Sequence, residues 1–292
     1  MTLVDRLLAP FRRPAARRTS AAAGLERRFR IDCELRYEVA GPTDFVFLLH
    51  AFDGGDQQVI EESIVCEPAA PLHVFSDAQG RRYTRLRAEG GEVALHYRAE
   101  VRRRAPVPAT RPRAERPVSE LPDELLPWLL PTRYCESDLL GHAARKLFGE
   151  RAAGEARVQA IVDWIHEHLD YAVGTTQAAT TSRDVFVQRA GVCRDFAHLA
   201  ITFCRALNIP ARFTVGYAPF ETPPPDFHAV CEAWLEGEWV PFDPTGLAPV
   251  EDLVRIASGR DASEVAFANI FGPARMVSMA PKIERLDAPG SG

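Results

Sequence analysis

The sequence predicts an α+β protein in which a small all-β sandwich precedes a region of helices followed by antiparallel strands. Two observations predict this fold class. Residues 29–104 alternate apolar and polar side chains with the two-residue period of strands, whereas after residue 122 the apolar residues recur at the three- and four-residue spacing of helices. Strand-like segments then return after residue 210. The chain of 292 residues is long enough for one large core or two ordinary ones.

The N-terminal β region is predicted from four alternating segments, which are separated by Gly-Pro, Gly-Gly and Gln-Gly breaks typical of turns. The segments are 29–39, 44–52, 73–89 and 92–104. We therefore expect an antiparallel sandwich domain at 29–104. Three histidines in it are single and scattered, which favours packing or solvation over metal binding. They are His50, His73 and His96.

Residues 105–122 are rich in proline and arginine, and this composition predicts a linker between two domains. We expect the second domain at 123–280 and a tail at 281–292. Because the linker separates two periodicities, a chain that starts near Ser119 is expected to fold by itself. Residues 1–28 are predicted to form a basic, disordered arm.

The net charge of −5 is unevenly distributed along the chain. Residues 1–30 carry a net charge of +6, which leaves −11 on the rest. An acidic body argues against a nucleic-acid partner, and no apolar run is long enough to cross a bilayer, so no membrane partner is expected either. Six cysteines without a C-x-x-C pair or framework spacing favour free thiols in a reducing, cytoplasmic compartment.

Two helices are predicted at 138–149 and 156–171, where apolar residues recur at helical spacing. The second contains His166 and His168. These two side chains lie about 200° apart around a helix, so they cannot bind one metal ion together.

A third helix is predicted from Cys193 to near Asn208. Its apolar stripe consists of Phe196, Ala200, Phe203 and Leu207, and it extends back to Cys193. Gly191 is expected to relax the backbone just before this helix. The first-turn N–H groups lack partners and the helix dipole favours negative charge there, which lowers the pKa of a thiol. Cysteines are also commonly buried and inert, so placement alone leaves both interpretations open.

A cysteine nucleophile needs a base, and the base needs an orienting group. Three strands are predicted after the third helix, at 211–220, 228–235 and 238–246. His228 begins one strand, and Asp243 lies near the end of the next. Glu236-Gly237 suits a two-residue turn between them.

With this turn, facing residue numbers sum to 473, so Asp243 faces Val230. Asp243 then becomes a diagonal neighbour of His228 on one face, about 7–8 Å away at the backbone. His198 lies about 140° from Cys193 around the helix, so it is not expected to serve Cys193. A zinc site is not expected either, because its candidate ligands lack compact spacing. Those candidates are Cys193, His198, Cys204 and His228.

Three segments, GVCRDFAHLA, DFHAVCEAWL and WVPFDPTG, resemble the Cys, His and Asp blocks of the transglutaminase-like superfamily. The chain is most similar to bacterial members with an N-terminal β domain, in which a P-x-R-Y-C block precedes the core and a GRDA block follows it. PTRYCESD at 131–138 and GRDA at 259–262 match these blocks. The resemblance covers residues 29–280 and implies a papain-like core in which the cysteine helix packs on an antiparallel sheet.

The resemblance implies that Cys193 is the nucleophile, His228 the general base and then acid, and Asp243 the orienting residue, with no cofactor. Such an enzyme attacks an amide of a peptide or protein and forms a thioester, which water or an amine then resolves. Gln188 is a candidate oxyanion donor, one residue off the spacing typical of papain-type enzymes.

No residue decides between hydrolysis and transamidation. The alternatives are a catalytically silent peptide-binding module and a partner subunit of a peptide-modifying complex. Four residues of the flanking blocks have no role that follows from the sequence: Tyr134, Cys135, Arg260 and Asp261.

Overall fold

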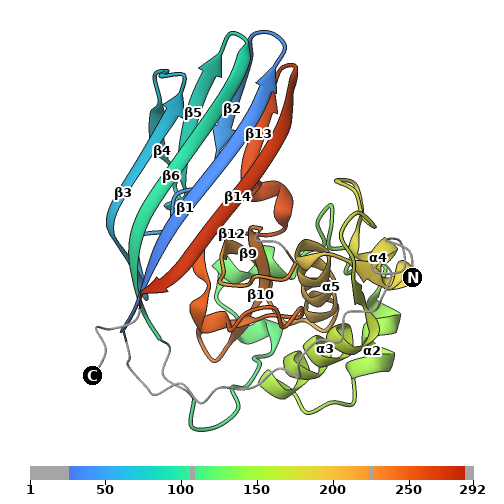
Figure 1. Ribbon diagram of the computed structural model, residues 1–292. Coiled ribbons are helices and arrows are strands. Elements are labelled where there is room, and N and C mark those ends of the chain that lie inside the picture. The colour runs from blue at the N-terminus through green and yellow to red at the C-terminus, as the bar shows by residue number, and fades with distance from the viewer. Residues whose placement is uncertain (1–25, 106–108, 224–225, 287–292) are drawn as a thin grey trace, which may run out of the picture. The chain divides into compact units, whose positions relative to one another are not determined.

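The computed structural model describes residues 26–105, 109–223 and 226–286 (Figure 1). The chain divides into two compact units, each built from segments that are separate in the sequence. Among the described residues, the helical unit comprises 111–212 and 230–247, and the β unit comprises the segments before 111, 213–229 and the segment from 248 onward. The arm predicted at 1–28 falls mostly outside the described residues, and its last three residues begin the first strand.

The β unit contains two four-stranded antiparallel sheets, with strand orders β14-β1-β6-β3 and β13-β2-β5-β4 (Figure 1). The strands are β1 Glu26–Val39, β2 Thr43–Phe47, β3 Gln57–Glu67, β4 His73–Ser76, β5 Arg82–Ala88, β6 Gly91–Arg104, β13 Ala268–Phe271 and β14 Ala274–Leu286. The predicted all-β sandwich and the α+β fold class are therefore confirmed.

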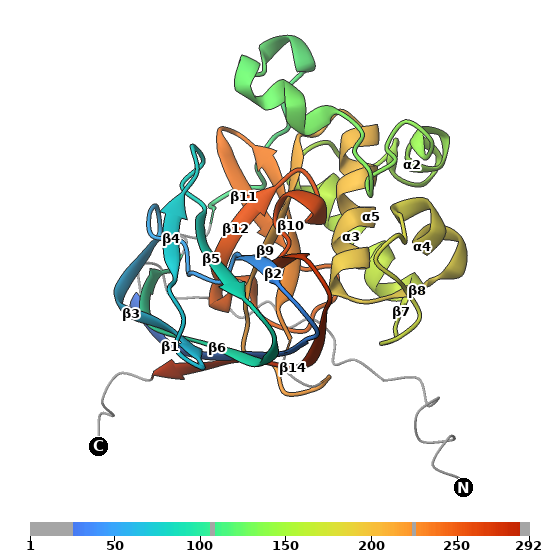
Figure 2. The same ribbon diagram turned by 90° about the horizontal axis from the view of Figure 1, so that it is seen from above.

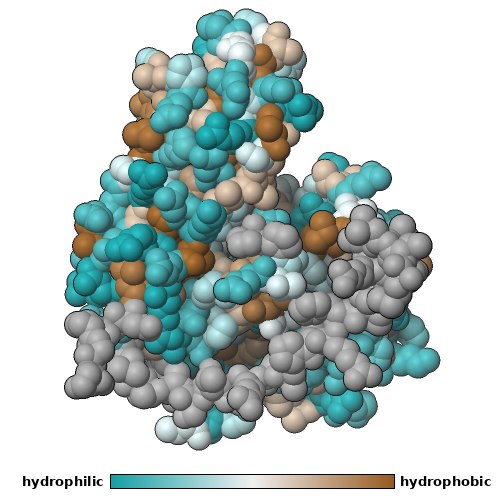
Figure 3. Space-filling model, viewed as in Figure 1, coloured by the Kyte–Doolittle hydropathy of each residue, from teal (hydrophilic) through white to brown (hydrophobic). Residues whose placement is uncertain are grey.

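Alternation along β1 explains why this segment forms a strand of a sandwich. Every second residue of its central part is buried: Phe29, Ile31, Cys33, Leu35 and Tyr37. The ring of Tyr37 lies 5.1 Å from that of Phe45 and 5.9 Å from that of Phe47, both in the facing sheet. The outer face of β1, β6 and β14 is largely hydrophilic (Figure 3). The buried aromatic rings therefore hold the two sheets together.

Two strands of the sandwich come from the C-terminal part of the chain. β14 pairs with β1 from Arg28↔Leu286 to Val39↔Ala274, and β13 pairs with β2. The sequence pattern instead predicts that these residues belong to the second domain and the tail. Partners more than 200 positions apart leave no local signal, so the sequence periodicity could not assign these strands to the sandwich.

Strand β3 is also absent from the strands predicted by sequence. It lies at the edge of its sheet, and its register against β6 shifts between Val59 and Glu61. Most of its residues are exposed, so it lacks the regular alternation that predicts a strand.

The β unit also includes β12 (Val254–Gly259) and most of β9 (Ala211–Tyr217). These strands belong to a third sheet with β10 (His228–Leu235) and β11 (Glu238–Phe242), in the order β11-β10-β9-β12. The buried side chain of Gln57 donates to the carbonyl of Arg255 and accepts from its N–H, both at 2.9 Å. The hydroxyl of Tyr217 donates to the carbonyl of Leu49 (2.8 Å). The sandwich and these later strands therefore complete one another's hydrogen bonds.

The helical unit contains α2 Gly141–Phe148, α3 Glu155–His168, α4 Ser182–Gln188 and α5 Cys193–Ala206. Of these, α2, α3 and α5 confirm the predicted helices, whereas α4 was not predicted. Figure 2 shows α5 beside α3 and α4, and α5 contacts α2, α3 and α4. The ring of Phe203 lies 5.2 to 5.9 Å from three rings of the neighbouring helices, those of Phe148, Trp164 and Phe186.

Part of the predicted linker packs against α3. Arg113 donates its N–H to the Glu155 carboxylate (2.9 Å) and accepts the Glu155 N–H (2.8 Å). Gly154 has a φ of 86°, and a Cβ at this position would lie 2.3 Å from the carbonyl oxygen of Arg113. The linker around Arg113 is therefore packed as part of the helical unit.

A partly buried polar network joins strands β3, β5 and β6 to the loop that follows β2. His50, which is 3% exposed, lies 2.8 Å from the hydroxyl of Thr84 and 3.2 Å from the carboxylate of Glu62. The hydroxyl of Tyr97 donates to the same carboxylate (3.0 Å), and Arg82 forms an ion pair with it. Burial raises the pKa of Glu62, but the hydrogen bonds and charges of His50 and Arg82 outweigh it and lower the pKa to about 2.

We expect this network to make folding stability pH-dependent in acid. The pKa of Glu62 is lower in the folded state than its ordinary value of 4.5, so its contribution is complete above pH 4.5 and is lost as the pH falls towards about 2. The loss is smaller than the roughly 3 kcal/mol that the full pKa shift corresponds to, because solvent screens this partly exposed carboxylate. Urea unfolding at a series of pH values measures it, and Glu62→Gln should remove this part of the slope.

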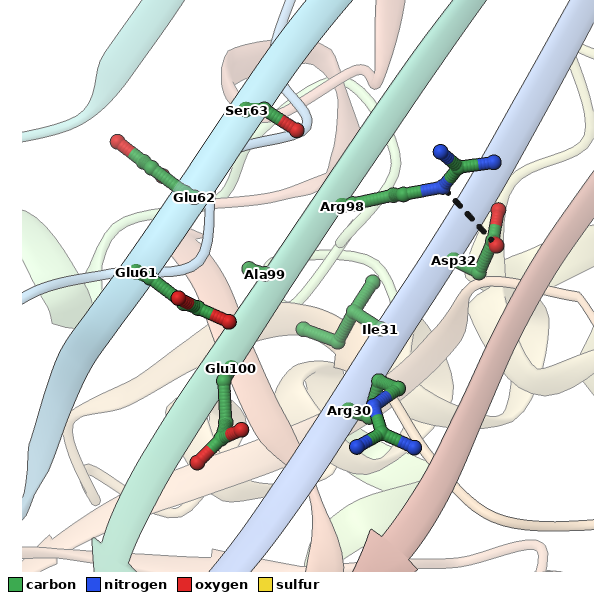
Figure 4. Close-up of a pocket in the computed structure, with 9 residues that line it drawn as sticks. All are labelled: Arg30, Ile31, Asp32, Glu61, Glu62, Ser63, Arg98, Ala99 and Glu100. Atoms are coloured by element: carbon green, nitrogen blue, oxygen red, sulfur yellow. Dashed lines mark hydrogen bonds and ion pairs between the residues drawn. The ribbon is translucent and has the colours of Figure 1, made fainter.

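The neighbouring Glu61 provides a matched control. Figure 4 shows that the side chains of Glu61 and Glu62 leave β3 in opposite directions, and Glu61 is exposed beside Glu100. Glu61→Gln should therefore keep the wild-type slope. Equal acid slopes for the wild type and Glu62→Gln would contradict the prediction.

Candidate active site

Cys193 is the first residue of α5, as predicted, and is 8% exposed. The preceding residue, Val192, is extended (φ −115°, ψ −178°), and the Phe196 N–H makes the first i→i−4 bond of the helix to its carbonyl (3.1 Å). The N–H group of Cys193 therefore lies ahead of the helical hydrogen-bond ladder, at the positive end of the helix dipole. The start of a helix is a position at which proteins place reactive cysteines.

The side chain of Asp195 stabilises the first turn of α5. This role is not among the sequence-based predictions. Asp195 Oδ2 accepts from the N–H of Val192 (2.9 Å) and from the hydroxyl of Thr176 (2.6 Å). The guanidinium of Arg194 donates to Oδ1 (3.2 Å). An acidic residue three positions after the N-cap is the sequence signal of a capping box. Only the Asp195 half of that motif forms, because Val192 has no side-chain acceptor.

Gly191 serves a different purpose from the predicted one. It lies in the short strand β8 (Ala190–Gly191), and its φ is not left-handed, so it does not supply unusual backbone freedom. A Cβ at this position would instead lie 2.7 Å from the Cβ of Asp195. The glycine is required because the side chain of Asp195 occupies the space beside it.

His228 and Asp243 belong to the strands of the predicted hairpin. His228 is the first residue of β10 (His228–Leu235) and is 1% exposed, and Asp243 directly follows β11 (Glu238–Phe242). Glu236 and Gly237 have φ values of 49° and 95°, as a two-residue turn requires.

The hairpin register confirms the predicted pairing. It runs from Leu235↔Glu238 to Cys231↔Phe242, so each pair of residue numbers sums to 473. One further step along this register leads to Val230 opposite Asp243.

The carboxylate of Asp243 is hydrogen-bonded by a residue two positions later in the chain. Its Oδ1 accepts from the N–H of Thr245 (2.8 Å) and from the Thr245 hydroxyl (2.7 Å). The ring of His228 packs edge-on against that of Phe220, with centroids 5.4 Å apart. Thr245 therefore restrains the side chain of Asp243, and Phe220, on the loop before β10, restrains that of His228.

Gln188 is the last residue of α4, and its side chain is exposed. The chain turns directly after it at Arg189, which has a φ of 61° and stacks over the rings of Trp164 and Phe186 at 4.6 and 4.5 Å. The role of Gln188 as an oxyanion donor stays a prediction.

The P-x-R-Y-C block packs on α5. The ring of Tyr134 stacks on that of His198 with centroids 5.1 Å apart, and its hydroxyl donates to the carbonyl of Ala178 (2.8 Å). Cys135 is fully buried. These contacts give the block a structural role, which the sequence alone did not reveal.

The GRDA block forms a local structure. Arg260 pairs with Glu264 (2.6 Å), and Asp261 caps the 3₁₀ turn Ala262–Glu264 by accepting from the N–H and hydroxyl of Ser263. In the described part of the chain, no three His, Cys, Asp or Glu side chains form a group that could hold a metal ion. No helix there is both long and apolar enough to span a bilayer.

Comparison with known proteins assigns the family. The sequence pattern of the transglutaminase-like superfamily matches residues 141–244, and that of the bacterial transglutaminase N-terminal domain matches residues 27–105. A crystal structure from Cytophaga hutchinsonii, described as that of a candidate cysteine protease, is 41% identical in sequence. The match covers 91% of this chain and 93% of that one, with a TM-score of 0.87. The chain belongs to the transglutaminase-like superfamily.

The curated relatives of this superfamily member are uncharacterised mycobacterial proteins. One from Mycobacterium leprae is 32% identical over 146 residues, which are 47% of this chain and 52% of that protein. One from Mycobacterium tuberculosis is 31% identical over 115 residues, which are 35% of this chain and 37% of that protein. The chain thus spans about half or less of the length of the curated relatives it matches. At family level, the Cytophaga structure and the superfamily match support a cysteine enzyme.

Proposed function

We propose that the protein is a cysteine enzyme that acts on amide bonds of peptides or proteins through a thioester intermediate. Cys193 is the nucleophile, His228 the general base and then acid, and Asp243 the residue that orients the imidazole. The observation that carries this proposal is the placement of all three at element ends. The thiol begins a 14-residue helix, His228 begins one strand of a hairpin with the predicted register, and Asp243 directly follows the other strand.

The chemistry follows from the properties of each group. The Cys193 thiolate attacks the amide carbonyl carbon, and the negative charge moves to the carbonyl oxygen, near the backbone N–H at the start of α5. The C–N bond then breaks, and His228 gives its proton to the departing amine. Asp243 keeps the imidazole in the tautomer that can accept and return this proton. Water or an amine finally attacks the thioester, giving hydrolysis or transamidation.

Two further proposals concern context. None of the six cysteines forms a disulfide and all six are buried, which supports a reducing, cytoplasmic compartment. A silent peptide-binding module is the alternative function. The presence of Cys, His and Asp at all three positions favours the enzyme, because a protein that only binds has no need of a nucleophile, a base and an orienting residue.

We expect Cys193 to be the most reactive thiol of the protein. Burial raises the pKa of Cys33 to about 12 and also raises that of Cys66. The hydrogen bond with Cys204, together with burial, raises the pKa of Cys231. Iodoacetamide at mildly acidic pH should therefore modify Cys193 first, and peptide mass mapping after timed exposure identifies the modified site.

His228→Ala should slow this labelling, because the charged imidazole stabilises the thiolate. The labelling rate of the other five thiols should stay unchanged in the same sample, which serves as the internal control. Faster modification of Cys204 or Cys231 than of Cys193 would show that the nucleophile has been assigned to the wrong residue.

A further inference from the structure

The N-terminal turn of α5 contains a carboxylate that has no part in the proposed bond-making steps. Asp195 is 1% exposed and lies two residues after the proposed nucleophile. A buried carboxylate is costly unless donors satisfy it. Here the N–H of Val192, the hydroxyl of Thr176 and the guanidinium of Arg194 all reach it within 3.2 Å. These three donors satisfy the carboxylate. It therefore opposes a thiolate at Cys193 less strongly than a carboxylate without hydrogen-bond donors would.

These bonds act directly on the backbone that carries the nucleophile. Val192 links two peptide planes, one that ends in its own N–H and one that ends in the N–H of Cys193. The bond from the Val192 N–H to Asp195 holds the first plane, and the 3.1 Å bond from Phe196 to the Val192 carbonyl holds the second. The direction of the Cys193 N–H and the position of the Cα that carries the thiol are restrained as a result.

A separate segment of the chain supports the carboxylate. Thr176 lies in the loop between β7 (Asp170–Tyr171) and α4, and its hydroxyl donates to Asp195 at 2.6 Å. The same loop accepts a second bond, from Arg194 to the carbonyl of Gln177 (3.0 Å). Gly191 completes the arrangement, because any side chain there would displace Asp195.

We propose that Asp195, supported by Thr176, is a positioning residue that holds the thiol and the backbone N–H of Cys193 in the geometry needed to attack an amide carbonyl. This inference rests on the proposed function of Cys193 as a nucleophile. Attack on a carbonyl needs the sulfur and the oxyanion donor aligned together, and small displacements reduce the rate strongly. Alkylation by a small, mobile electrophile needs only an accessible thiolate. Reaction at a carbonyl therefore reports on the alignment of the sulfur with the oxyanion donor, and alkylation reports on the thiolate alone.

The test compares two probes on the full chain. One is iodoacetamide, and the other is a peptidyl diazomethyl ketone, whose carbonyl must occupy the position of the scissile amide. Thr176→Val keeps the shape of the side chain and removes only the hydroxyl donor to Asp195. We expect this variant to lower the rate with the peptidyl probe by about tenfold or more. The pH profile of iodoacetamide labelling and the melting temperature should stay near those of the wild type.

The chain offers a matched control at another helix. The hydroxyl of Thr181 donates to Asp184 Oδ2 at 3.0 Å at the start of α4, in the same kind of cap but without a nucleophile. Thr181→Val should leave the ratio of the two labelling rates unchanged. Thr176→Ser should restore the wild-type ratio, and Asp195→Asn should lower the peptidyl rate, because it weakens the bond to Arg194 and the hold on the turn.

Each outcome has a separate meaning. If the wild type reacts with the peptidyl probe at Cys193 and folded Thr176→Val reacts equally fast, Asp195 is only a structural cap and the inference is overturned. The same conclusion follows if both labelling rates fall together in proportion to lost folded protein. If the wild-type protein fails to react with the peptidyl probe, the proposed function itself is contradicted, and the inference with it.

Discussion

Cys193→Ala is expected to abolish turnover of every amide substrate that the protein accepts while leaving the protein folded. The change removes one sulfur atom from a residue at the end of a helix, so the effect on packing is small, whereas no other group can form the thioester. We expect the rate to fall by about 10³-fold or more. A steady-state assay on a glutamine-containing peptide, together with circular dichroism, measures both properties.

Cys66→Ala is the matched control, because Cys66 has the same exposed fraction, 8%, but lies in strand β3. This variant should keep full activity. Turnover by Cys193→Ala within about tenfold of the wild-type rate would exclude Cys193 as the nucleophile.

The same assay ranks the other two members of the proposed triad. Asp243→Asn keeps an Oδ1 that can accept from the N–H and hydroxyl of Thr245, and an amide can still hold an imidazole, as in Cys-His-Asn sites. It should retain measurable turnover, and Asp243→Ala should fall between it and Cys193→Ala. Wild-type activity in both Asp243 variants would remove this residue from the mechanism. An Asn variant as inactive as Cys193→Ala would show that the carboxylate charge is indispensable.

A chain that starts at Ser119 is expected to give no soluble folded protein. This differs from the prediction that the linker composition at 105–122 supports, in which the second domain folds by itself. Removing residues 1–118 leaves β14 without β1 and β13 without β2. It also deletes Gln57 and the carbonyl of Leu49, which bond to β12 and β9.

Size-exclusion chromatography and thermal melting of the truncated chain test this expectation. A chain that starts at Leu25 is the control, because it retains every described strand, and it should melt as the full chain does. Co-expression of residues 1–118 as a separate fragment should recover soluble protein. A cooperative melt of the Ser119 chain alone, near the full-length temperature, would show that the later segments fold without the first six strands.

The sequence by itself determined the elements whose signal is local. Helices α2, α3 and α5 followed from three- and four-residue apolar spacing, because a helix pairs residues within one turn. The hairpin of β10 and β11 followed from two turn residues, because turn length fixes strand register. The positions of Cys193, His228 and Asp243 at element ends followed from these two rules. The cap formed by Thr181 and Asp184 shows that α4 also had a local signal, which was overlooked.

Only the tertiary structure decided which distant segments meet. Strands β13 and β14 join β2 and β1 because their backbone donors and acceptors find partners there, and nothing in residues 268–286 specifies those partners locally. The support of Asp195 by Thr176 likewise depends on a loop folding back over the start of α5. Local periodicity reports which face of an element is buried. It does not report what covers that face, because many partners satisfy the same burial and only the folded chain selects one.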